Sequence, residues 1–109
     1  MDFAFSTTEL RDVCEDRRTA IDTLGNHAAL ELGERLADME AHSTVADFAA
    51  LFGVDISVRS ASTLVVRLKA GCDIVFCAGH VKVPTTASGE TDWSKVTKVK
   101  ILALEVAHG

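Results

Sequence analysis

Apolar residues recur along this chain with two different periods, and the period changes near residue 53. Before that point they return every three or four residues, as on amphipathic helices. Beyond it they alternate with polar residues, as on strands that bury one face. A short segment at residues 2–5 precedes the helical part and is predicted to be a strand. The expected order is therefore strand, helices, strands, which is typical of an α+β domain.

The helical half is predicted to contain two main helices and a shorter third one. A capping box at residues 6–9 predicts the start of the first helix, and polar residues around Asp16 predict a bend within it. The other expected boundaries follow from capping residues and glycines: Gly25 after the first helix, residues 27–41 for the second, Ser43 or Thr44 before the third, and Gly53 after it.

The second half is predicted to contain four strands. A turn at residues 70–73 is expected to join two of them as a hairpin, and the last strand is expected over about residues 96–106. Residues 79–95 contain the only proline and read as a long loop, a kind of segment that is usually functional or mobile. The predicted fold is one α+β domain over residues 1–109. Its N-terminal strand and two main helices pack on one face of a mostly antiparallel sheet of four to five strands.

Composition restricts the function classes. The formal net charge of −5 argues against binding nucleic acid by bulk attraction. The charge is uneven, however, because residues 1–53 carry four Lys and Arg against eleven Asp and Glu, whereas residues 54–109 carry seven against five. Three cysteines, no apolar leader and no long apolar run predict a cytoplasmic protein outside the membrane.

Basic residues are expected to gather on one face of the sheet. If the even-numbered positions of the strands face the helices, then Arg59, Arg67 and Lys69 point the other way. In the last strand, Lys98 and Lys100 also share a face. A basic sheet face is a candidate surface for a phosphate backbone, although solvated sheet faces commonly carry Arg and Lys as well.

One segment carries a family resemblance. The run Asp92-Trp93-Ser94-Lys95-Val96-Thr97-Lys98-Val99-Lys100-Ile101-Leu102 resembles the RelE/ParE superfamily of bacterial toxins, and most of all its HigB-like branch of plasmid-maintenance or killer proteins. The segments Leu68-Lys69 and Ile74-Val75-Phe76 share in the resemblance. It implies the toxin of a type II toxin–antitoxin pair, an endoribonuclease (mRNA interferase) that inhibits translation by cutting mRNA, usually on the ribosome. Its expected partners are mRNA, the ribosome and a helix-turn-helix, HigA-like antitoxin, and a homodimer remains open.

The resemblance also implies which residues act. Cleavage without a metal uses the neighbouring 2′-hydroxyl of the RNA, so the protein has to orient the phosphate, stabilise its charge and move protons. No metal or cofactor is expected. The catalytic candidates are His108, Lys69 and Arg67, and the RNA-binding candidates are Arg59, Lys98, Lys100 and Trp93. The chain departs from the family pattern at Asp73, where an Arg is usual, and at Val106 and Ala107, where an Asp-Tyr pair is usual.

Several alternatives stay open. The departures motivate a second hypothesis, a toxin-like binding module with weakened catalysis that acts through an antitoxin or DNA-binding partner, and a gyrase poison is a third. Trp93 is expected to anchor the loop onto the sheet if it does not stack on a base. His108 has the alternative of a solvated terminal histidine. Cys72, Cys77 and His80 have metal-ligand character but no fourth ligand at useful spacing.

Overall fold

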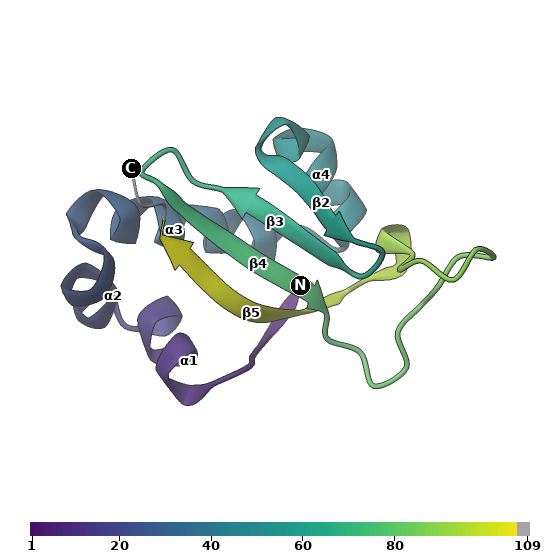
Figure 1. Cartoon of the computed structure of the whole chain (residues 1–109), viewed down its shortest axis with the longest axis horizontal. Helices are drawn as coiled ribbons and strands as arrows, with labels where there is room; N and C mark the ends of the chain where they lie inside the picture. Colours follow the sequence, from purple (N-terminus) through teal and green to yellow (C-terminus); the bar gives the residue numbers. More distant parts are fainter. Residues whose placement is uncertain (107–109) are drawn as a thin grey trace.

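The structure is a computed structural model that describes residues 1–106 of the chain. Its elements follow the expected order of strand, helices and strands (Figure 1). The elements are β1 (Asp2–Phe5), α1 (Thr8–Glu15), α2 (Arg17–Leu24), α3 (Asn26–Ala41), α4 (Val45–Phe52), η1 (Gly53–Asp55), β2 (Ile56–Ser60), β3 (Thr63–Arg67), β4 (Cys72–Ala78), η2 (Trp93–Lys95) and β5 (Lys98–Val106).

The five strands form one sheet in the order β1-β5-β4-β3-β2. The strands β2 to β5 pair antiparallel with their neighbours, whereas β1 lies parallel to β5. A parallel pair needs a long connection, and here nearly the whole chain provides it. The α+β class is confirmed, and the sheet is mixed because its first and last strands are parallel neighbours.

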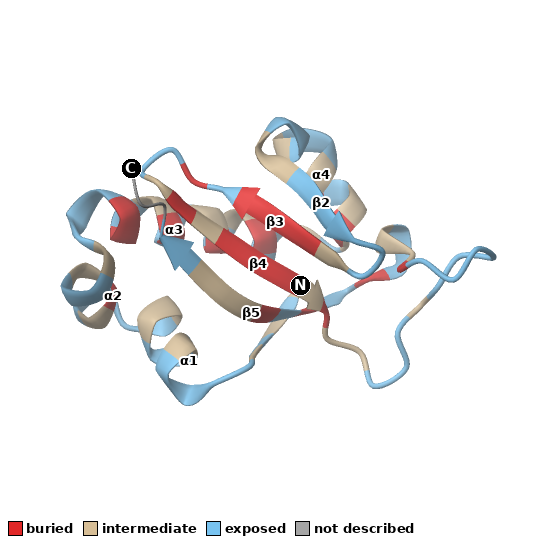
Figure 2. Ribbon diagram, viewed as in Figure 1, coloured by how far each residue is buried: buried red, intermediate tan, exposed pale blue. Residues whose placement is uncertain are grey.

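The helices pack on one face of the sheet and leave the other face uncovered (Figure 1). Even-numbered residues of β3 and β4, such as Leu64 and Ile74, point into the core between sheet and helices. Figure 2 shows buried residues concentrated in β3 and β4, with β2 exposed at the sheet edge. The largest fully buried side chains join both layers: Phe48, Leu32 and Met39 from the helices, and Phe76, Ile74 and Ile101 from the strands.

The first helical segment is divided, as expected, at Asp16. This residue has extended backbone angles and separates α1 from α2. Helix α1 is capped by Thr7, whose hydroxyl accepts a hydrogen bond from the Leu10 amide at 3.1 Å. The predicted capping box at residues 6–9 therefore does not form: Thr7 alone caps the helix, and the Ser6 hydroxyl donates instead to the carbonyl of Leu102 in β5. Gly25, with φ of 86°, ends α2 at the predicted place.

The long loop predicted at residues 79–95 lies between β4 and β5. It extends beyond the sheet in Figure 1. An isolated bridge joins Thr85 to Thr91, and the buried Thr91 donates its amide to the carbonyl of Ala61. The start of this loop is tightly packed, since a Cβ on Gly79 would lie 3.0 Å from the carbonyl carbon of Val99. In the described part of the chain, no helix combines the length and apolarity needed to span a bilayer.

Candidate functional site on the open sheet face

The face of the sheet away from the helices is called the open face. Strand pairing places alternate residues of β2 to β5 on it, because side chains of residues paired in register project to the same side. Most of the candidate cations lie there, next to Asp73, which departs from the family pattern, and next to Glu105, which the sequence did not single out. Its principal members are Arg59, Val65, Arg67, Asp73, Val75, Cys77, Lys98, Lys100 and Glu105.

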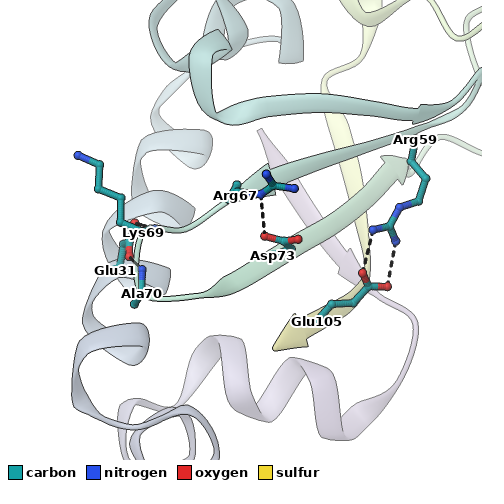
Figure 3. Close-up of polar contacts among 7 residues, drawn as sticks. All are labelled: Glu31, Arg59, Arg67, Lys69, Ala70, Asp73 and Glu105. Atoms are coloured by element: carbon teal, nitrogen blue, oxygen red, sulfur yellow. Dashed lines mark hydrogen bonds and ion pairs between the residues drawn. The ribbon is translucent and has the colours of Figure 1, made fainter. Parts of the chain in front are cut away.

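Arg59 is held by a carboxylate of its own chain. Its two terminal nitrogens donate to Glu105 at 2.9 and 2.8 Å, a bidentate pair (Figure 3). Because β3 and β4 lie between β2 and β5, this pair reaches over both central strands on the open face. The open-face side chains of those strands, Val65 and Val75, are only 3% and 4% exposed. We call the Arg59–Glu105 pair the strap.

The strap shifts the pKa of both members in the direction that favours their charged forms. The hydrogen bond from Arg59 lowers the pKa of Glu105, and the same bond raises the pKa of the Arg59 guanidinium. Both donors that match a phosphate in geometry are therefore occupied by a carboxylate, which has a similar geometry. A polyanion has to compete with Glu105 for these two terminal donors of the guanidinium.

Arg67 has a similar neighbour. It is the cross-strand partner of Asp73, and its Nε lies 3.6 Å from a carboxylate oxygen of that residue. The Arg67 side chain is 72% exposed, so this ion pair is weak and its guanidinium remains accessible to solvent. Asp73 nevertheless places a negative charge on the face between Arg67 and Glu105, its two cross-strand partners, where an incoming phosphate would be repelled.

Lys69 does not share this face, so the expectation that it lies with Arg59 and Arg67 is wrong. Strand β3 ends at Arg67, and the alternation of side chains ends with it. The amides of Lys69 and Ala70 instead donate to the two carboxylate oxygens of Glu31 in α3, at 2.7 and 2.8 Å. Figure 3 shows the Lys69 side chain extending beside α3, away from both guanidinium groups.

Two lysines on the open face form no ion pair among the described residues, although the strand register places Asp2 of β1 beside Lys98. Lys98 and Lys100 are exposed on β5, and neither forms an ion pair within residues 1–106. Lys100 is the cross-strand partner of the half-buried Cys77, whose pKa is raised by burial and lowered in part by that lysine. Their spacing along one strand, with Val99 buried between them, agrees with the alternation read from the sequence.

The remaining candidates have other surroundings. Trp93 packs edge-on against the buried Phe76, with ring centroids 6.0 Å apart, so it anchors the loop to the core. Cys72 is buried in the core, and His80 accepts a hydrogen bond from the Thr97 amide through Nε2. Among the described residues, no three His, Cys, Asp or Glu side chains gather as a metal site requires. His108 and Ala107 lie outside the described residues.

Sequence reasoning missed the ion pairs that Asp73 and Glu105 form with the two arginines of the open face. Asp73 was noticed only as a departure from a family pattern, although its place in the hairpin opposite Arg67 could have shown the pairing. Glu105 gave no sequence signal, because 46 residues separate it from Arg59 and the strands of the two residues are not adjacent in the sheet.

Comparisons of the chain with protein-family models, with curated proteins and with solved structures gave no match.

Proposed function

We propose that this chain is a toxin-like binding module of a bacterial type II toxin–antitoxin system. Its RNA cleavage is weakened, and it acts through a protein partner. The family assignment rests on the sequence resemblance around residues 92–102, and the strand, helix and sheet order of the domain is compatible with it. The expected partner is a small helix-turn-helix antitoxin.

One observation favours binding over cleavage. Both arginines of the open face lie against carboxylates of the same chain, Arg59 on Glu105 and Arg67 beside Asp73. A metal-free nuclease depends on cations that are free to stabilise charge on the phosphate in the transition state. Here the charges of both arginines are partly neutralised by these carboxylates, and Lys69 does not lie on the open face.

The test is expression of the full chain alone in bacteria, followed by growth measurement and mapping of mRNA 5′ ends. The binding-module proposal predicts unimpaired growth, intact mRNA, and a stable complex when a neighbouring helix-turn-helix protein is co-expressed. Growth arrest with new mRNA ends that vanish in Arg67→Ala would overturn it.

A ribosome-dependent endoribonuclease is the second candidate function. It is favoured by Lys98 and Lys100, which are exposed on the open face without ion pairs in the described chain, and by the accessibility of Arg67. This candidate predicts that Lys100→Ala reduces cleavage of translated mRNA. Lys82→Ala, an equal loss of charge in the exposed loop, is the matched control and should leave cleavage unchanged.

A further inference from the structure

An apolar groove lies on the helical side of the molecule, and no residue of the sheet lines it. It is lined by residues of α1, α2 and α3, is open to solvent and has a volume of about 470 Å³. Most of its lining is aliphatic or small, and a few charged residues stand at its margin. The apolar lining residues are Val13, Cys14, Ala20, Ala29, Leu30, Leu32, Gly33 and Ala37.

Gly33 makes this groove unusual. It lies in the middle of α3, is exposed, and has no positive φ that would require glycine. Glycine inside a helix is less stable than alanine, so a glycine here needs another reason. A Cβ at Gly33 would meet nothing within 4 Å, so the position leaves open space inside the groove. With Ala29 and Ala37 one turn away on either side, it gives α3 a surface that another helix can approach closely.

The walls of the groove present an unpartnered apolar surface. Leu30 is 53% exposed although it lies on a helix with a well-buried face. Cys14 contributes a neutral thiol, since burial raises its pKa to about 12. Exposed apolar surface of this kind, gathered in a concave site, is characteristic of sites that bind a ligand or another protein.

The charge around the groove indicates what kind of partner fits. Its margin carries the carboxylates of Glu15 and Glu34 against one guanidinium, that of Arg17. The segment that forms α1, α2 and α3, residues 8–41, has nine acidic and four basic residues. A partner whose apolar contact surface is flanked by Lys and Arg complements this field, whereas an acidic partner is repelled.

We propose that the groove binds an amphipathic helix of a partner protein, with a row of apolar residues flanked by Lys and Arg. A helix is the element that packs on a surface of α1, α2 and α3 built from small residues, and the groove offers no strand edge for β-pairing. The proposal rests on the proposed binding function and identifies the surface and the chemistry of the partner.

The experiment uses the full chain and a synthetic helical peptide of about 18 residues, with a Leu/Ala stripe flanked by Lys and Arg. Two peptides serve as controls: one flanked by Glu, and one with the basic peptide's composition in scrambled order. Binding is measured by isothermal titration calorimetry, and its place by amide chemical shifts in NMR. The proposal predicts that only the ordered basic peptide binds, and that it shifts the amide of Gly33 but not that of Gly79 across the molecule.

The decisive variant is Gly33→Leu, which fills the groove at a position where the fold has room. Its melting temperature should be at least that of the wild type, and peptide affinity should fall at least tenfold. Gly33→Ala, which adds a single methyl group, should lose much less. Equal binding of the scrambled peptide, or undiminished binding by Gly33→Leu, would overturn the proposal.

Sedimentation of the chain without peptide tests the other occupant. If the wild type self-associates and Gly33→Leu does not, the groove binds a second copy and the partner-helix proposal is wrong. These outcomes differ from failure of the proposed function, which would be seen as mRNA cleavage and growth arrest. A nuclease with an intact groove would still bind the basic peptide.

Discussion

Replacing Glu105 with glutamine is expected to convert the open face from a poor RNA-binding surface into a better one. The substitution removes the carboxylate that holds both terminal nitrogens of Arg59 at 2.8 and 2.9 Å, and it keeps the shape of the side chain. The released guanidinium then joins Lys98 and Lys100, which have no ion pairs among residues 1–106. Asp73→Asn is expected to release Arg67 in the same way.

The magnitude follows from the number of cations released. For single-stranded nucleic acid, each additional phosphate contact steepens the dependence of log K on log salt by about 0.7. Glu105→Gln is therefore expected to steepen the slope by about 0.7, equivalent to roughly fivefold tighter binding at 0.1 M salt. The double variant with Asp73→Asn should steepen it by about 1.4 and bind roughly 25-fold tighter.

The assay is fluorescence anisotropy of a labelled RNA oligonucleotide, titrated with protein between 0.05 and 0.2 M salt. The matched control is Asp22→Asn, which makes the same change in net charge and releases Arg18 from an exposed ion pair on α2. If the control gains as much affinity as Glu105→Gln, only net charge matters. If neither open-face variant gains affinity, the strap does not restrict RNA binding and the reasoning from the open face is wrong.

Three further predictions concern the architecture and its charge states. Gly79→Ala should lower the free energy of unfolding in urea by about 1–3 kcal/mol, because the new methyl lies 3.0 Å from the Val99 carbonyl carbon and the backbone of β5 has to move; wild-type stability would contradict this. Glu31→Ala should cost about 1–2 kcal/mol in the same assay, since two amides of the turn after β3 lose their acceptor. Thr19→Ala should raise the pKa of Asp16, because the Thr19 hydroxyl at 2.6 Å is the main cause of its lowered value. A carboxyl group whose pKa is lowered by folding stabilises the fold at pH values above its unfolded pKa, and this stabilisation is lost as the pH falls through the folded pKa. The variant should therefore be less stable than the wild type at pH 7 but equally stable near pH 2. A stability difference that stays constant across that range would refute the linkage.

The alternation of apolar residues was sufficient to predict the strands that form the core. Leu64, Val66 and Ile74 are buried where the pattern placed them. Helix boundaries followed from local chemistry: Gly25 ends α2 with positive φ, and Asp16 interrupts the first helical segment as expected. Such features depend on neighbours a few residues away, so the sequence contains the information directly.

The candidate site depended on contacts that local sequence does not encode. The alternation placed Arg59 and Arg67 on the open face correctly, but it did not apply to Lys69, because the strand ends two residues earlier and Glu31 binds the amides of the turn. The sequence alone determined the period, the helix ends at Gly25 and Thr44, and the α+β class of this protein. Only the tertiary structure decided that β1 lies beside β5 and that Glu105 reaches Arg59 across two strands. Strand order and sheet twist bring residues from distant parts of the chain together, and no local pattern records that pairing.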